Sequence, residues 1–239
     1  MSRTRSVALA ALTLLVLSAG CAGLFGGESE QARQLQQASL DAMGSVDTYE
    51  FEMTMTASAE EQSVEVEAAG VANRSGPRST LTVTVDTPRG DQRVTAYLVG
   101  GTAYAEAGGR WQTREVDLAE QRDRLQQMEE ILNASTVAFE GNSTLDGEPV
   151  STLRLEVPQD RLDELSVLSQ GGGGAGVADF DFTEFTYTLQ VSRDDHLPRQ
   201  VEIDATAQAG GRSIDLTGTV RYSEFGRPQN ITLPADAPA

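Results

Sequence analysis

Cysteine and histidine, the residues with the most versatile side-chain chemistry, occur once each in this 239-residue chain, as Cys21 and His196. A disulfide within the chain needs two cysteines, and a zinc site built on paired histidines needs a second histidine. His196 follows two aspartates in a pattern typical of a solvated turn. No catalytic triad or other catalytic constellation is recognisable around it. The sequence therefore predicts no enzyme and no bound cofactor.

One acidic pattern and one glycine run were weighed as ligand sites. Asp179, Asp181 and Glu184 alternate with phenylalanines but lack the turn glycine and the twelfth-position glutamate of an EF-hand. An exposed strand face is favoured there, and no metal site is predicted. The glycine-rich run at 171–176 contains no basic residue to meet a phosphate. It is predicted to be a flexible linker, with a mobile lip over a cavity as the alternative.

Cys21 closes an N-terminal segment with the layout of an export signal. A short basic start precedes an apolar run at residues 7–17, which is shorter than a comfortable bilayer-spanning helix. The segment at 17–21, Leu-Ser-Ala-Gly-Cys, resembles the lipobox of exported lipoproteins. That resemblance implies a signal peptide at 1–20 and lipidation of Cys21, which would hold the protein at the membrane. A cleaved signal that happens to carry a cysteine, or an uncleaved anchor helix, are the alternatives.

The charge of the chain is strongly one-sided. It has 36 acidic and 18 basic residues, a formal net charge of −18, and every basic residue is arginine. Such a surface repels nucleic acid, so no nucleic-acid partner is expected. An acidic excess without lysine resembles the proteins of extreme halophiles, including archaea, where concentrated salt screens carboxylate repulsion. We therefore interpret the charge as an adaptation to the solvent.

The asparagines point to the same side of the membrane as the export signal. All four of them begin an N-x-S/T sequon, the acceptor for N-glycosylation. They are Asn73, Asn133, Asn142 and Asn230. The sequence thus predicts a glycosylated, extracytoplasmic protein attached to the cell membrane.

The periodicity after Cys21 separates helices from strands. Residues 21–29 are predicted to be a glycine-rich tether, and three- and four-residue spacing predicts a helix from Glu30 to about Val46. Period-two alternation then continues from Tyr49 to Trp111 and indicates an antiparallel meander. Two more helices are predicted, at Leu118–Leu132 and Pro158–Leu168.

A hairpin separates these two helices, and further strands end the chain. The hairpin turns at Asp146-Gly147, a favoured tight-turn pair. The predicted closing strands are Phe185–Val191, Gln200–Ala207, Ser213–Tyr222 and Gln229–Leu233. Each strand has one apolar face, which the helices are expected to cover. The predicted fold class is α+β, with a curved, one-sided antiparallel sheet (a half β-barrel), helices on its concave face, and a single domain at 30–239.

The order of these elements resembles that of LolA/LppX-type lipoproteins. The matching features are the opening helix that runs into the segment at 46–51, the Gly100-Gly101 hairpin before Trp111, and the ending at 222–234. The resemblance implies non-enzymatic binding or carriage of a lipid or another hydrophobic ligand. The alternative is a cell-surface interaction or structural module whose core is filled by its own side chains and which binds no ligand.

Four apolar side chains on one predicted strand are the candidates for contact with such a ligand. They are Tyr49, Phe51, Met53 and Met55. Methionine and aromatic side chains adapt well to irregular apolar ligands. Ordinary core packing explains the same residues as well, and the sequence leaves both interpretations open.

Overall fold

The computed structural model describes residues 24–60, 62–87, 90–119, 121–162, 165, 181–209 and 211–238. Its helices are α1 (Leu24–Gly44), α2 (Arg124–Ala134) and the short α3 (Gln159–Leu162). The first six strands are β1 (Thr48–Ala59), β2 (Gln62–Asn73), β3 (Arg78–Asp86), β4 (Gln92–Val99), β5 (Thr102–Ala107) and β6 (Arg110–Glu115). The remaining strands are β7 (Thr136–Leu145), β8 (Glu148–Glu156), β9 (Asp181–Ser192), β10 (Pro198–Ala209) and β11 (Arg212–Ser223).

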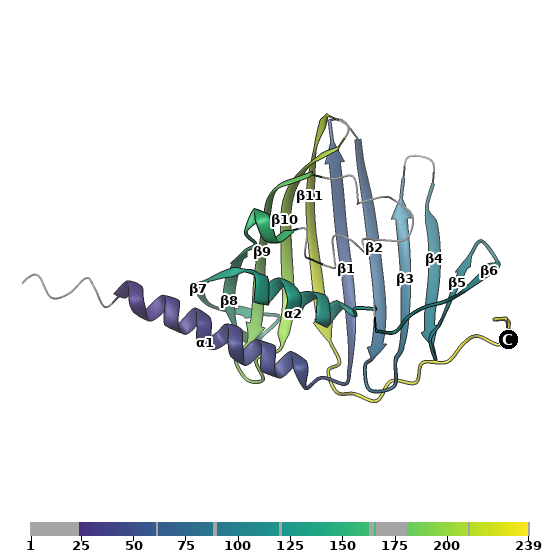
Figure 1. Ribbon diagram of the computed structural model, residues 1–239, viewed down its shortest axis with the longest axis horizontal. Helices are drawn as coiled ribbons and strands as arrows, with labels where there is room; N and C mark the ends of the chain where they lie inside the picture. The colour runs from purple at the N-terminus through teal and green to yellow at the C-terminus, as the bar shows by residue number, and fades with distance from the viewer. Residues whose placement is uncertain are drawn as a thin grey trace, which may run out of the picture.

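The strands of the described residues form one antiparallel sheet in the order β6-β5-β4-β3-β2-β1-β11-β10-β9-β8-β7. Two meanders therefore meet in the middle of the sheet, where Phe51 of β1 lies opposite Tyr222 of β11. The sheet is open, because β6 and β7 lie at its two edges (Figure 1). This confirms an open, antiparallel α+β architecture with few helices.

Local sequence explains the tight connections between neighbouring strands. Asp146 and Gly147, between β7 and β8, have φ values of 50° and 90°. A two-residue hairpin of this twist needs positive φ at both positions, which aspartate and glycine tolerate. The predicted hairpin is therefore confirmed.

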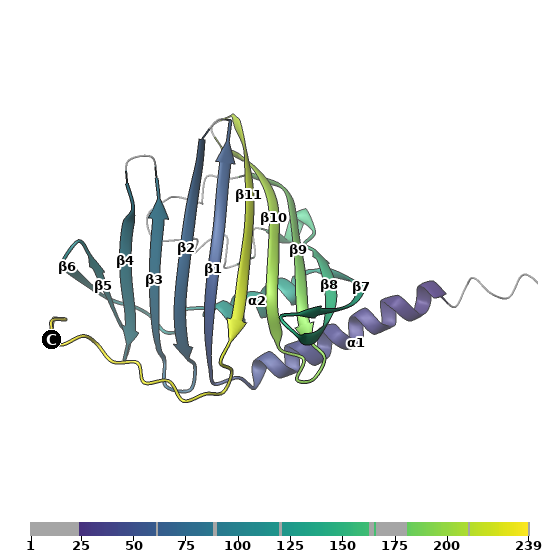
Figure 2. The ribbon, with the colours of Figure 1, turned by 180° about the vertical axis from the view of Figure 1, so that it is seen from behind.

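Helices α1 and α2 both lie across one face of the sheet, which we call the inner face (Figures 1 and 2). Buried apolar side chains fill the space beneath them, among them Ala32 and Met43 of α1 and Leu125 and Leu132 of α2. Because each strand alternates its side chains, the same core takes one apolar residue in two from the sheet. Among the described residues, no helix is both long enough and apolar enough to cross a membrane.

The boundaries of the predicted helices differ from those observed. α1 begins at Leu24, so part of the segment predicted to be a tether is helical. α2 begins six residues later than predicted, because Asp123 caps its first turn and Leu118 stays exposed in the preceding segment. α3 has four residues, and most of the remainder of the helix predicted at 158–168 lies outside the described residues.

The strand predicted at 229–233 is wrong. This segment has no strand ladder and runs along the ends of the strands on the outer face, the side away from α1 and α2 (Figure 2). Side-chain bonds hold it there: Gln229 donates to Glu50 at 2.8 Å, and Arg78 donates to the Ile231 carbonyl at 3.1 Å. Because β11 already has β10 and β1 as neighbours, the chain that follows it finds no free edge beside it.

Candidate functional site

The four predicted ligand residues of β1 all point to the inner face but lie at different depths. Tyr49 is fully buried and Phe51 is 6% exposed, whereas Met53 and Met55 are half-buried further along the strand. The ring centroid of Tyr49 lies 6.4 Å from that of Phe51 and 6.2 Å from that of Tyr222. Tyr49 and Phe51 therefore belong to the packed core, and the two methionines lie beside it.

A glycine gives Phe51 its position. A Cβ at Gly70, opposite Phe51 on β2, would lie 2.6 Å from the Phe51 ring and 2.6 Å from the Thr80 carbonyl oxygen. These distances are far inside van der Waals contact, so only glycine lets the ring lie against the neighbouring strand. The ring also faces the Arg124 guanidinium, whose central carbon is 5.8 Å from the ring centroid.

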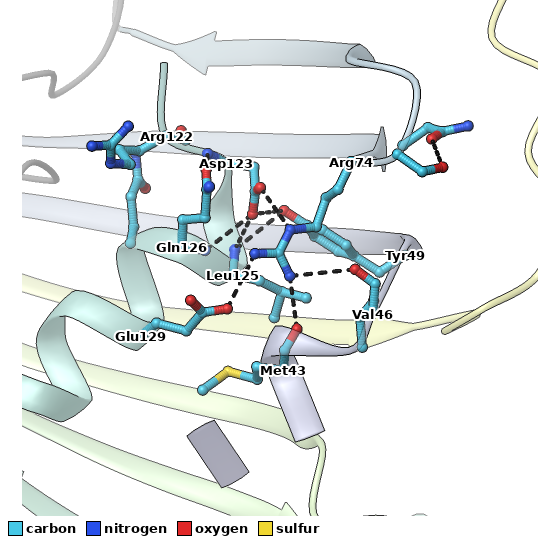
Figure 3. Close-up of polar contacts among 12 residues, drawn as sticks. Met43, Val46, Tyr49, Arg74, Arg122, Asp123, Leu125, Gln126 and Glu129 are labelled. Carbon is cyan, nitrogen blue, oxygen red and sulfur yellow. Dashed lines mark hydrogen bonds and ion pairs between the residues drawn. The ribbon is translucent and has the colours of Figure 1, made fainter. Parts of the chain in front are cut away.

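A polar cluster at the start of α2 fastens that helix to the sheet (Figure 3). The Asp123 carboxylate accepts hydrogen bonds from the backbone N–H groups of Leu125 and Gln126, and the Gln126 Oε1 accepts one from the Asp123 N–H. This capping box satisfies amides that the first helical turn leaves without partners. The Tyr49 hydroxyl adds a third bond to Asp123, at 2.9 Å.

Arg74, at the start of the β2–β3 turn, joins both helices to this cluster (Figure 3). Its guanidinium donates to the carbonyls of Met43, at 2.7 Å, and Val46, at 3.3 Å, where α1 ends. It also pairs with Asp123 at 3.1 Å and with Glu129 of α2 at 3.2 Å. One side chain thus bonds to the C-terminal end of α1, to the residue that caps α2 and to an acidic residue within α2.

Burial sets the protonation of the cluster. It raises the pKa of Tyr49 well above that of a free phenol, and the nearby Asp123 carboxylate raises it further. Burial also raises the pKa of Glu129, although Arg74 opposes the change. Tyr49 is therefore a permanent donor at neutral pH. Because the groups of the cluster satisfy one another, we assign it to holding the helices in place.

The inner face continues beyond the helices as an apolar surface on β3, β4 and β5. No described helix lies over these strands (Figure 1). Its residues are Leu81 and Val83 of β3, Val94, Ala96 and Leu98 of β4, and Ala103 and Ala105 of β5; we call them the apolar strip. They are half-buried except Val94, which is 38% exposed. The strip is therefore an apolar part of the inner face that no described helix covers.

Sequence reasoning missed the polar cluster that holds α2, and it missed that no described helix covers the strip. The aspartate and glutamine at 123 and 126 were a readable signal, since that spacing is typical of a capping box. Nothing in the sequence marked Arg74, whose partners lie 28 to 55 residues away. The alternation of β3–β5 predicted strands correctly but gave no indication of which strands the helices would leave open.

Two surface depressions lie on the opposite, outer face. One, of about 290 Å³, is lined mainly by threonines of β1 and β11 with Glu202 and Asp204 of β10. The other, of about 260 Å³, adds Glu184 of β9 and Asp215 of β11. Hydroxyl and carboxylate walls give an acyl chain little apolar contact. Neither depression therefore suits a lipid.

The remaining predicted sites are dispersed. Asn133, Asn142 and Asn230 are exposed, and Asn73 is half-buried at the end of β2, where its Oδ1 accepts a hydrogen bond from the Gly76 N–H at 2.9 Å. His196 lies in the β9–β10 turn, as predicted. Within the described residues, no group of three metal-ligating side chains comes together. Cys21, Asp179 and the glycine-rich run at 171–176 lie outside the described residues.

Solved structures share this fold at low sequence identity. The lipoprotein LppX of Mycobacterium tuberculosis superposes with a TM-score of 0.51 and 15% identity, over 85% of this chain and 99% of LppX. LprF of Mycobacterium bovis gives a TM-score of 0.51 and 14% identity, over 88% of this chain and 99% of LprF. No protein-family model matches the chain, and no curated protein sequence matches it. The fold is therefore that of an LppX-like open half-barrel.

Proposed function

We propose that this protein is an extracytoplasmic lipoprotein, anchored to the cell membrane through Cys21, that binds a lipid or another hydrophobic ligand without chemical turnover. The observation that carries the proposal is the apolar strip, a half-buried surface on the same sheet face as the core, with no described helix over it. In this proposal the inner face is the concave side of the half-barrel and the helices pack on it. The similarity to lipoproteins such as LppX supports it.

Binding would follow from transfer of acyl chain out of water. Each buried methylene contributes about 0.8 kcal/mol. The inner face of β3, β4 and β5 carries no charged side chain, so little desolvation cost opposes this transfer. Met53 and Met55, half-buried beside the core, extend the apolar surface toward the strip. Tyr49 and Phe51 would belong to the packed core beside the site and would not contact the ligand.

Native mass spectrometry of gently purified protein tests ligand binding. We expect a bound mass that organic extraction removes and identifies as lipid. A clean unliganded mass, together with no uptake of added short-chain lipid, would favour the second candidate, a surface module whose core is filled by its own side chains. The full burial of Tyr49 is the observation that favours that second candidate.

The anchor has its own test. Replacing Cys21 by Ser removes the thiol that lipidation requires, so the protein should move from the membrane fraction to the medium. Ser18→Ala, three residues upstream, is the matched control and should stay membrane-bound. Retention of the Cys21→Ser protein in the membrane would contradict the anchor.

The sequons and the charge complete the proposal. We propose N-glycosylation at Asn73, Asn133, Asn142 and Asn230, and a saline external medium as the reason for the net charge of −18. Three of these asparagines are exposed, as a glycan requires. Intact-mass measurement before and after enzymatic or chemical deglycosylation checks occupancy.

A further inference from the structure

The edge strand β6 ends the inner face with a row of hydrogen-bond donors. Arg110, Gln112 and Arg114 lie opposite Ala107, Ala105 and Ala103 of β5, and all three are exposed. Because side chains alternate along a strand, these three share the inner face with the apolar strip. Trp111 and Thr113 point to the outer face, where the Trp111 ring packs 6.1 Å from that of Tyr97.

The register connects each of these donors to an apolar row. Arg110 ends the row of cross-strand neighbours Val83, Val94 and Ala107. Gln112 ends the row Leu81, Ala96 and Ala105. Arg114 ends a shorter row, Leu98 and Ala103. With neighbouring strands about 4.8 Å apart, the first two rows run about 14 Å from β3 to β6, and the third runs about 10 Å from β4 to β6. The surface is therefore apolar along most of its width and polar along one border.

The charges on this half of the sheet are sorted by face. Every carboxylate of β1–β6 lies on the outer face: Glu50, Glu52, Glu65, Glu67, Asp86, Glu106 and Glu115. The inner face of the same strands has none, although the chain as a whole has a net charge of −18. Within the described residues neither Arg110 nor Arg114 makes an ion pair, whereas Arg154 and Arg221 on the outer face pair with Glu156 and Asp146. The two edge guanidiniums are therefore available to an external anion.

We propose that the apolar strip and the row Arg110, Gln112 and Arg114 together bind an anionic amphiphile, a lipid with a phosphate-bearing head group. The acyl chain lies along β3–β5 and the head group meets β6. Guanidinium groups bind phosphate oxygens in pairs of hydrogen bonds, and the Gln112 amide adds a neutral donor between them. The inference rests on the proposed lipid binding and specifies the charge of the lipid.

Short-chain lipids that differ only in the head group test the proposal. Dioctanoyl phosphatidic acid, dioctanoyl phosphatidylcholine and inorganic phosphate are titrated calorimetrically into the wild-type chain. The same titrations follow for the double variant Arg110→Gln/Arg114→Gln and for the control Arg93→Gln/Arg154→Gln, which removes the same charge from the outer face. Circular dichroism establishes at which salt concentration all proteins are folded, and every titration uses that concentration.

We expect the wild-type protein to prefer the acidic lipid by about tenfold, the scale of one or two charge-assisted hydrogen bonds. The β6 double variant should lose this preference and keep its affinity for the phosphatidylcholine, while the control keeps both. Gln112→Glu, which leaves both arginines in place, should also lower the affinity for the acidic lipid. This single variant keeps the test decisive if the double variant does not fold.

Three results would overturn the head-group assignment. They are equal affinity of the wild type for both lipids, an unchanged preference in both β6 variants, and binding of inorganic phosphate as tight as that of the acidic lipid. Failure of the wild type to bind either lipid is a different result, because it overturns the proposed function itself. If Arg110 and Arg114 served only to protect the sheet edge from pairing with other chains, the β6 variants would aggregate and keep the same lipid preference. That result would also contradict the proposal.

Discussion

The hydroxyl of Tyr49 on β1 donates a hydrogen bond to Asp123, the residue that caps α2, across 2.9 Å. The same hydroxyl accepts the Leu125 N–H at 3.2 Å. A core residue of the central strand thus completes the first turn of the helix above it. The start of α2 therefore depends on the sheet as well as on its own capping box.

Replacing Tyr49 by Phe should lower the free energy of unfolding by about 1–2 kcal/mol, because the Asp123 carboxylate loses a buried donor. Urea denaturation monitored by circular dichroism measures the change. Tyr104→Phe is the control: Tyr104 is half-buried on the outer face and makes no hydrogen bond within the described residues, so its effect should stay within about 0.5 kcal/mol. Equal effects of the two substitutions would contradict the role of the Tyr49 bond.

Arg74→Met should destabilise the protein by about 2 kcal/mol, because Asp123 and Glu129 then lose their shared cation in a partly buried site. The exposed pair of Arg154 with Glu156 gives the control. Arg154→Met should cost less than about 0.5 kcal/mol. Hydrogen exchange locates the damage: amides at the start of α2 should lose protection in the Arg74 variant and remain protected in the control.

Gly70→Ala should destabilise by about 1–3 kcal/mol, since the added methyl group meets both the Phe51 ring and the Thr80 carbonyl. At Gly44, the end of α1, a Cβ meets nothing within 4 Å, so Gly44→Ala should be neutral or slightly stabilising. Thermal unfolding of the two alanine variants makes the comparison. A neutral Gly70→Ala would mean that Phe51 moves freely away from β2.

Glu65 of β2 and Asp86 of β3 lie directly opposite each other in the register. Like charges in this position repel, so Asp86→Asn should stabilise the protein by about 0.2–0.5 kcal/mol at low salt. The gain should vanish above about 1 M salt, where the Debye length is about 3 Å. Glu67→Gln, which faces Thr84, is the matched control and should gain less. A gain for Asp86→Asn that persists at high salt would contradict a charge-based origin.

Acid should weaken the contact that Arg199 makes with two carboxylates. The hydrogen bond that Arg199 donates to Glu148 lowers the pKa of that carboxyl group. For Asp195, burial acts to raise the pKa, but bonds from Arg199 and from the Leu197 N–H outweigh it, so that pKa is lowered too. A carboxyl group with a lowered folded-state pKa adds stability above its unfolded pKa, and that stability disappears as the pH falls through the folded value.

Wild type and Arg199→Gln are therefore compared by urea denaturation at about pH 6 and about pH 3, on either side of the unfolded carboxyl pKa values. The loss of stability on acidification should be smaller in the variant, by less than about 1 kcal/mol because Glu148 and Asp195 are partly exposed. Arg33→Gln removes the cation that lowers the pKa of Glu30, but this pair on α1 is exposed and screened by solvent, so the variant should change the pH dependence less than Arg199→Gln does. Identical pH dependence in wild type and Arg199→Gln would exclude the contact as its source.

Local patterns in the sequence were enough to predict the strands, the tight turns and the face each side chain takes. Alternation is a property of neighbouring residues, and Asp146-Gly147 needs only its own backbone geometry to turn the chain. The predicted strand at 229–233 failed because apolar alternation does not reveal whether a sheet edge is free. The same local patterns gave the four sequons and the export signal, which remain predictions for Cys21 and the asparagines.

Only the tertiary structure decided which of these surfaces meet. Pairing of β1 with β11 places Phe51 opposite Tyr222, far away in the sequence, and Arg74 finds its partners at the ends of two helices. The sequence grouped Tyr49 and Phe51 with Met53 and Met55, and the structure separates them because α2 covers only one end of the strand. Arg110 and Arg114 look like ordinary surface charges in the sequence. The register of β3–β6 places them beside an apolar face, since contacts across a sheet depend on strand order rather than on local sequence.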